Sequence, residues 1–308
     1  MGTSKGILTV GTVTVELSFS YGQEARDGIS LLSEPPILGY GGAGGGQALA
    51  LAKLGYKAPL CTMVGEDANG KRLLEYFSQN GVDTRFMEQV KGGKTAVVTT
   101  LKKEGEDEQI LLYPGQTGKI PHRLILDSFM SMPDALSLRA ELPFDTLLYA
   151  AGVAEEKGIP VFLDANSIRK DFFPEELPSL EILSLSEEAV QQLTGIEVGG
   201  TESSVKAVLA LTSFVKAKYF VFRLGARGCF LFDGKIPQHI APYRMPAFDY
   251  SISGDGFTAA LVGTYLETDG QIRTACEYAN GAMAFCAAKG KSADPYPSKQ
   301  DILQVLHQ

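Results

Sequence analysis

The chain has 308 residues, 44% of them hydrophobic and 21% charged, which is enough to bury a core as one large α/β domain or two small ones. Its formal charge of −8 argues against a nucleic-acid partner, although a local basic pocket for a small anion stays compatible with it. The four cysteines lack C-x-x-C spacing, and residues 1–15 contain only the short apolar run ILTV. We therefore expect a reduced, cytoplasmic protein without a signal peptide or membrane partner.

The N-terminal part of the chain predicts strands on either side of one helix. Residues 7–10 read as a buried strand, and apolar residues alternating over 13–19 predict a second strand with one solvent-facing side. The segment up to residue 38 contains two adjacent prolines and is predicted as strand and turn. A glycine-rich bend then enters a helix that ends near Gly55 and leads into a strand over residues 59–64, a βαβ-like unit.

A small separate sheet is predicted from the next segments. The loop GEDANG, residues 65–70, leads into a helix that ends at Gly81. Two β-rich runs, residues 95–102 and 109–113, flank the charged turn KKEGEDE and predict a hairpin. We expect this hairpin and the strands within residues 11–40 to pair apart from the main sheet.

From residue 121 onward, helices and short strands alternate. This alternation predicts a parallel sheet covered by helices on both faces, with functional loops at the carboxyl ends of its strands. Because the sequence shows neither an internal repeat nor a linker, we expect one domain.

Residues 39–44 satisfy G-x-G-x-x-G, the fingerprint of dinucleotide-binding sites, and precede a helix. However, the segment before them is interrupted by proline, and they do not follow the first strand, which disfavours a dehydrogenase. No G-x-x-x-x-G-K-[ST] motif occurs, so a P-loop kinase or ATPase is not expected.

The stretch DYSISGDGF, residues 249–257, joins a polar turn to a helix, because Phe257, Leu261 and Tyr265 recur at helical spacing. Unpaired backbone N–H groups and the dipole at such a helix end attract anions, and small residues let a phosphate approach the main chain. A carboxylate beside it, Asp255, can take a proton from an acceptor hydroxyl, as phosphoryl transfer requires. The alternative is that Asp255 only caps the helix.

Two further motifs have two interpretations each. In LGARG, Gly225 and Gly228 either let a ligand approach the backbone or form a tight hairpin. In DAN-x-x-R, Asp164 and Arg169 follow a buried strand. They belong either to a functional edge of the sheet or to a helix cap and a surface ion pair.

Taken in order, the motifs resemble those of the ribokinase-like sugar kinases, the PfkB family, over nearly the whole chain. The series is Gly-Gly near residue 41, GEDANG, DAN-x-x-R, the SEE...LTG helix, LGARG, and D-x-x-x-S-G-D-G-F followed by Asn280. The resemblance implies a single domain over residues 1–308, a three-layer α/β sandwich whose mostly parallel central sheet is covered by helices on both faces. It adds a β-sheet lid from about 11–40 and 95–113, and it implies a carbohydrate kinase that moves the γ-phosphate of ATP to a hydroxyl of a sugar or sugar-like substrate.

The resemblance also implies roles for single residues. The general base is Asp255, and the backbone donors of an anion hole are Ile252, Ser253 and Gly254. The ATP site is lined by Gly225 and Gly228, with Asn280 near the adenine. The implied cofactors are ATP and Mg²⁺, with a monovalent cation as a further candidate and no metal ligands assigned.

On the sugar side, the resemblance places Glu16, Gly41 and Gly42 against the substrate. The chain departs from the family pattern here, since Glu16 replaces an Asp, and Gly46 stands where an Asn supplies a hydrogen bond. Because specificity lies in a few lid and pocket side chains, ribose, fructose, 2-keto-3-deoxygluconate and nucleosides all stay open as substrates.

Other departures fall on the phosphate side. Ile252 and Ser253 replace Gly and Ala, and Ser186 replaces the Asn of an N-x-x-E motif associated with magnesium and phosphate. Arg223 stands where a Thr is usual, and either reaches a phosphate or faces solvent. Since losing one anion-hole donor lowers a rate on the order of 10²–10³-fold, the alternative function is a weakened kinase fold that binds ligands or acts as a scaffold. A homodimer formed through the lid is a further expectation.

Overall fold

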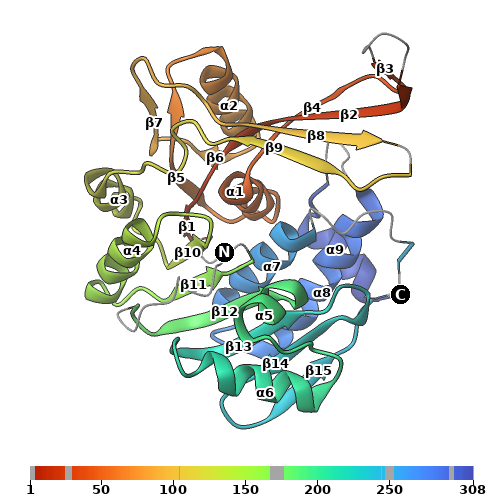
Figure 1. The fold of residues 1–308 in the computed structure, drawn as a ribbon. Helices are drawn as coiled ribbons and strands as arrows, with labels where there is room; N and C mark the ends of the chain where they lie inside the picture. The colour runs from red at the N-terminus through yellow and green to blue at the C-terminus, as the bar shows by residue number, and fades with distance from the viewer. Residues whose placement is uncertain are drawn as a thin grey trace.

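The computed structural model describes residues 4–24, 30–103, 105–166, 177–243, 245–246, 253–290 and 295–307 (Figure 1). Within them, the larger sheet has ten strands in the order β15-β14-β13-β12-β11-β10-β1-β5-β6, with β7 also paired to β5. The strands are β1 (Ile7–Val10), β5 (Ala58–Gly65), β6 (Val82–Asp83), β7 (Met87–Val90), β10 (Ala135–Arg139), β11 (Val161–Asp164), β12 (Leu180–Ser186), β13 (Ala217–Arg223), β14 (Cys229–Phe232) and β15 (Pro237–Ile240). Because only the β13–β14 and β14–β15 pairs are antiparallel, the sheet is mostly parallel, as predicted.

Helices cover both faces of this sheet. One face carries α3 (His122–Ser128), α4 (Phe144–Glu156), α5 (Glu187–Thr194) and α6 (Thr201–Leu211), and the other carries α1 (Ala43–Lys53), α7 (Ser253–Glu267), α8 (Ile272–Lys289) and α9 (Lys299–Leu306). Strand β13 shows how the two faces are separated. Phe220 and Phe222 belong to the first hydrophobic cluster and Val221 to the second, because successive side chains of a strand point to opposite faces.

A second, five-stranded sheet lies beside α1 and α2 (Ala68–Gln79), above the main body in Figure 1. It consists of β2 (Thr14–Glu24), β3 (Ser30–Leu32), β4 (Ile37–Gly41), β8 (Val97–Lys103) and β9 (Gln109–Tyr113). The predicted hairpin is confirmed, since β8 and β9 pair antiparallel, but β2 pairs with β8 in parallel. Val13 and Val15 pack against buried residues of α1 and α2 and so attach this sheet to the body.

One predicted loop boundary is wrong. Helix α2 begins at Ala68, inside the segment GEDANG, because the Asp67 carboxylate caps it and accepts the Gly70 N–H at 2.9 Å. The same carboxylate accepts the backbone N–H of Thr95 at 3.0 Å and the Thr95 hydroxyl at 2.6 Å. The start of α2 is therefore fastened to the start of the predicted hairpin segment.

None of the helices in the described segments is long and apolar enough to cross a membrane. The four cysteines are buried free thiols, and burial raises the pKa of Cys61 to about 12, which keeps that thiol protonated and unreactive.

Candidate active site

Charged side chains stand at the carboxyl ends of the central strands. β10 ends at Arg139, β11 at Asp164 and β13 at Arg223, and the register places Arg139 opposite Asp164. Because these strands run in parallel, their ends meet at one edge of the sheet, where ligands of open α/β sheets bind. The first turns of α7 lie over this edge, since Thr258 donates to Asp164 at 2.8 Å.

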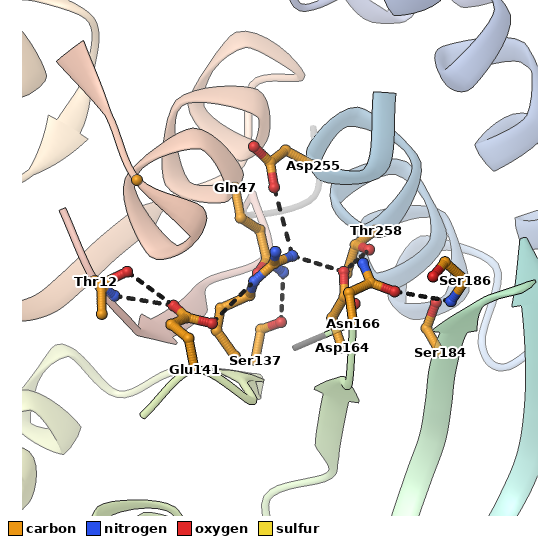
Figure 2. A network of polar contacts seen from close by, with 12 residues as sticks. Thr12, Gln47, Ser137, Glu141, Asp164, Asn166, Ser184, Ser186, Asp255 and Thr258 are labelled. Carbon is orange, nitrogen blue, oxygen red and sulfur yellow. Dashed lines mark hydrogen bonds and ion pairs between the residues drawn. The ribbon is translucent and has the colours of Figure 1, made fainter. Parts of the chain in front are cut away.

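Asp164 is the centre of a buried charge network (Figure 2), with 1% of its surface exposed. Its Oδ2 accepts Nη1 of Arg139 at 2.6 Å and Nη1 of Arg223 at 2.9 Å. Burial by itself raises the pKa of Asp164, but the two guanidinium groups outweigh it and hold that pKa below its ordinary value. The interpretation of Asp164 as a helix cap or surface ion pair is therefore wrong, and Arg169 lies outside the described residues.

Arg223 does not face solvent, because its charge is paired inside the protein. Besides Asp164, its Nη1 donates to the Ser184 hydroxyl at 3.2 Å and to the Thr258 hydroxyl at 3.1 Å. A Cβ atom added to Gly254 would lie 3.6 Å from the guanidinium carbon of Arg223. Arg223 thus places a positive charge directly behind the first turn of α7.

Asp255 is the third residue of α7 and is therefore not its N-cap. Its Oδ1 lies 3.4 Å from Nη1 of Arg139, and its Oδ2 accepts the hydroxyl of Tyr296 at 3.2 Å. Burial raises the pKa of Asp255 to about 6, although Arg139 and the Tyr296 hydroxyl act in the opposite direction. Asp255 is thus mostly ionised at neutral pH, with a proton affinity suited to general-base work.

The predicted anion-hole residues are only partly described. Ser253 is buried and Gly254 is partly exposed, and both lie in the first turn of α7. Ile252 lies outside the described residues.

The predicted sugar-side residues come together where the second sheet meets α1. Glu16 of β2 accepts the backbone N–H of Gly42 at 3.1 Å through Oε1. A Cβ atom on Gly41 would lie 2.7 Å from the same oxygen. Gly42 has φ 87°, and a Cβ atom there would lie 2.7 Å from Cα of Val13, so the glycine allows the helix to start against this segment.

Gly46 lies one turn further along α1 and touches the opposite part of the site. A Cβ atom there would lie 2.2 Å from Oδ2 of Asp255 and 2.6 Å from the hydroxyl oxygen of Tyr296. The sugar-side glycines and the carboxylate of α7 therefore border a single site.

Sequence reasoning missed Arg139, Glu141 and Tyr296. Glu141 accepts the backbone N–H and the hydroxyl of Thr12 at 3.2 and 3.0 Å and lies 3.8 Å from Nε of Arg139 (Figure 2). A usable signal for Arg139 and Glu141 was the pair of charged residues at and just after the end of the buried strand ALSLR. Tyr296 follows a proline-containing segment before α9, and no local pattern marks it.

The predicted nucleotide-side residues surround the ends of β12 and β13. Ser186 caps α5 by accepting the N–H of Ala189, at 3.2 Å. Gly225 opens a short 3₁₀ turn with φ 52° and has no described atom within 4 Å of an added Cβ, whereas a Cβ on Gly228 would lie 2.2 Å from the carbonyl oxygen of Ile240. Gly228 is thus needed for packing, while Gly225 leaves its backbone open to approach.

Asn280 is buried on α8 and holds the chain after β15. Its Nδ2 donates to the carbonyl oxygens of Ile240 and Ala241 at 3.1 and 3.0 Å, and its Oδ1 has no hydrogen-bond partner among the described residues. Nearby, a cavity of about 360 Å³ is bordered by Leu224, Arg227, Phe230, His239 and Pro242, among others. In the part of the chain that is described, no three potential metal-ligating side chains cluster.

Comparison with known proteins identifies the family of this chain. The family described as pfkB family carbohydrate kinase matches residues 6–299. The chain is 26% identical to a ribokinase of Haemophilus influenzae, with 98% of both chains covered. It is 25% identical to a probable fructokinase-4 of Arabidopsis thaliana, with 91% of each covered.

The fold agrees as well. The structure of Arabidopsis thaliana ribokinase complexed with ribose and ATP superposes with a TM-score of 0.86 at 22% identity, covering 99% of this chain and 100% of that one. The chain therefore belongs to the pfkB family of carbohydrate kinases and has the ribokinase-like fold predicted from its motifs. Its predicted class of activity, carbohydrate kinase, is confirmed.

Proposed function

We propose that this protein transfers the γ-phosphoryl group of ATP to a hydroxyl of a sugar or sugar-like substrate, with Asp255 as the general base. The observation that carries the proposal is the position of Asp255. Its carboxylate lies in the first turn of α7, in contact with Arg139 and Tyr296 and beside Gly46 of α1. An acceptor hydroxyl held against α1 can therefore give its proton to Asp255 while it attacks a phosphoryl group at the start of α7.

The anion hole is assigned to the backbone N–H groups at the start of α7, from Ser253, Gly254 and, by the family pattern, Ile252. Helix-end donors and the helix dipole stabilise the charge that develops on the transferring group. Arg223 adds a positive charge behind Gly254, and its contacts with Asp164 and Thr258 keep it in place.

ATP is assigned to the side of the site formed by Gly225, Gly228, Asn280 and Ser186. The cavity beside Leu224 can hold the adenine ring. The Arabidopsis structure named above contains ATP, and a structure described as a putative ribokinase II of E. coli contains ATP and Mg²⁺. Magnesium that arrives with ATP is usually held by phosphates, water and at most one or two carboxylates, which fits the absence of a three-ligand cluster from the described residues. When bound, it neutralises phosphate charge, and a monovalent cation stays a further candidate.

The sugar is assigned to the space between Glu16, Gly41, Gly42, Gly46 and Asp255. Carboxylates there accept hydrogen bonds from sugar hydroxyls, and ribokinases and fructokinases among the relatives make ribose-like and fructose-like sugars the first candidates. The second sheet would close over this space and exclude water. We assign residues 1–308 to one domain, and we keep a cytoplasmic location as a prediction.

A turnover experiment tests this assignment. Asp255→Asn should keep the fold and nucleotide binding while turnover falls roughly 10²–10⁴-fold, because only general-base help is lost. ADP release would be followed with ATP, Mg²⁺ and a panel of ribose, fructose, 2-keto-3-deoxygluconate and nucleosides, with melting temperature as the check of folding. Full activity of the variant would show that Asp255 is not the base.

The alternative, a kinase fold kept for ligand binding or scaffolding, is less well supported, because the carbohydrate-kinase match spans residues 6–299 and Asp255 contacts the sugar-side helix. Calorimetry with an ATP analogue and each sugar separates the two. A wild-type protein that binds neither and turns over none of the sugars would favour the scaffold.

A further inference from the structure

We propose that Tyr296 and Arg139 are positioning residues that hold the two oxygens of the Asp255 carboxylate, and that Gly46 is the residue that makes room for Tyr296. The inference rests on the proposed role of Asp255 as the base. It concerns three positions that the motif series did not connect, on α1, at the end of β10 and before α9.

Tyr296 reaches the site from the segment that precedes α9. Its ring packs against both the hydrophobic cluster of α7 and α8 and the cluster that joins α1 to the second sheet. Its hydroxyl lies 3.2 Å from Oδ2 of Asp255. Burial, followed by the charge of Asp255, raises the pKa of the Tyr296 phenol well above its ordinary value, so the phenol stays protonated and acts as the donor in this hydrogen bond.

Gly46 and Tyr296 form one arrangement. A Cβ atom at position 46 would lie 2.6 Å from the Tyr296 hydroxyl oxygen and 2.2 Å from Oδ2 of Asp255, so any side chain there would displace the pair. A hydrogen-bonding side chain is missing from α1 at this position, and the Tyr296 hydroxyl stands in the space beside it. The polar group that faces the acceptor site is therefore supplied by the C-terminal segment.

Arg139 holds the other oxygen of the base. Its Nη1 lies 3.4 Å from Oδ1 of Asp255 and is itself anchored by Oδ2 of Asp164 at 2.6 Å. Arg139 stays charged, because although burial lowers its pKa, Asp164, Asp255 and Glu141 together raise that pKa above its ordinary value. A fixed positive charge therefore faces Asp255 from β10.

The other groups that face Asp255 act on it in both directions. Asp164 on β11 repels its negative charge, while Arg223 on β13 attracts it. The thiol of Cys286 on α8 packs against the next residue, Gly256, and stays neutral, because burial and Asp255 raise the Cys286 pKa. Among the described residues, only Arg139 and Tyr296 contact the carboxylate directly in a way that favours its ionised form. Arg139 does so through its positive charge, and Tyr296 through a hydrogen bond that its hydroxyl donates.

The pH dependence of kcat/KM tests the inference. In the wild type, activity should fall below about pH 6, where Asp255 takes up a proton. Arg139→Gln should move this acidic limb up by about one to three pH units, and Tyr296→Phe by roughly one unit or less. Arg139→Lys should restore most of the shift, because it returns the charge. Tyr56→Phe is a matched control, because it removes a phenol that donates to Glu267 at 2.9 Å away from the site.

Variants that lower kcat/KM equally at every pH, with the acidic limb unmoved, would show that Arg139 and Tyr296 only support the fold. A measurement without turnover separates this failure from failure of the proposed function. The difference in free energy of unfolding between the wild type and Asp255→Asn should grow as the pH rises and then become constant. The pH at which it becomes constant reports the pKa of Asp255 in the folded protein. Introducing Tyr296→Phe into both proteins should raise this folded-state pKa of Asp255. An unchanged pKa would overturn the inference even if no sugar is turned over.

Gly46→Ala tests the spatial part. Its loss of kcat/KM should be at least about threefold smaller in the Tyr296→Phe background than in the wild type, because one of the two atoms that the new methyl group meets is then gone. Equal losses in the two backgrounds would show that Gly46 does not make room for Tyr296.

Discussion

At the scale of single residues, the pKa values of the neighbouring carboxyl groups of Asp164 and Asp255 are shifted in opposite directions. Asp164 lies between two guanidinium groups, and its pKa is below the ordinary value, while burial raises the pKa of Asp255 to about 6. Ionised Asp164 therefore stabilises the fold, whereas ionised Asp255 opposes it. A destabilising group kept at the start of α7 is typical of a functional residue.

Asp164→Asn should lower the free energy of unfolding by about 3–5 kcal/mol, because it leaves Arg139 and Arg223 buried without their shared counter-ion. Urea unfolding measures the loss. Asp83→Asn is the control, since Asp83 pairs with Arg85, whose side chain is 69% exposed, and should change stability little. Equal effects of the two substitutions would contradict the structural role given to the buried network.

Asp255→Asn should have the opposite effect on stability. A carboxyl whose pKa is raised by folding binds its proton more tightly in the folded state, so the folded protein gains stability as the pH falls from about 6 toward 4. The variant lacks the ionised form and should be more stable than the wild type at pH 8, by up to about 3 kcal/mol, with the two converging near pH 4. Denaturant unfolding across this pH range measures the difference, and a variant less stable than the wild type at pH 8 would refute the prediction.

At the scale of elements, the start of α1 depends on a glycine for two separate reasons. Gly42 has φ 87° and ψ 156°, a conformation that is essentially restricted to glycine and costs other residues roughly 1–3 kcal/mol. It also lies close to the preceding segment, because a Cβ atom at this position would fall 2.8 Å from the carbonyl oxygen of Thr12 and 2.7 Å from Cα of Val13. Gly42 is therefore a packing requirement of the junction between α1 and the second sheet, as well as a border of the proposed sugar site.

Gly55 provides a comparison without close packing, because it follows α1 with φ 83° and has no described atom within 4 Å of an added Cβ. Gly55→Ala should cost only the conformational term, more than about 1 kcal/mol. Gly42→Ala should cost clearly more, because the methyl group also meets the backbone. Equal losses in urea unfolding would mean that the junction shifts freely to accept a side chain.

At the scale of the whole molecule, the second sheet leaves apolar side chains in solvent. Ile110, Leu111, Leu112 and Tyr113 of the edge strand β9 are each more than half exposed, as is Ile37 of β4. An edge strand exposed on both faces is a surface that another chain can cover. A second copy of this chain is the occupant expected from the homodimer that the family resemblance implies.

We predict a dimer at micromolar concentration, measured by sedimentation velocity. Ile110→Glu with Leu112→Glu should convert it to a monomer, because both substitutions place charge on one face of β9. Leu209→Glu, on the 63% exposed Leu209 of α6, is the control and should leave the assembly unchanged. A monomeric wild type, or a dimer that survives the double substitution, would contradict this interface.

Much of the fold followed from local sequence. Alternating apolar residues marked the strands of the second sheet, glycines marked the ends of α1 and α2, and the small residues at 253–256 marked the start of α7. These signals are local because backbone geometry and side-chain periodicity act over a few residues. The family resemblance of the ordered motifs, and not these local signals, implied that Glu16, Gly42 and Asp255 belong to one site.

Only the tertiary structure decided what surrounds Asp255. Arg139, Glu141 and Tyr296 come from separate elements, and their contacts depend on strand register and on the path of the chain before α9. Burial then determines the pKa values, since the same carboxyl group is acidic beside two guanidinium groups at Asp164 and more basic at Asp255. The sequence by itself determined which residues can do the chemistry, while long-range packing decided which of them meet and in which charge state.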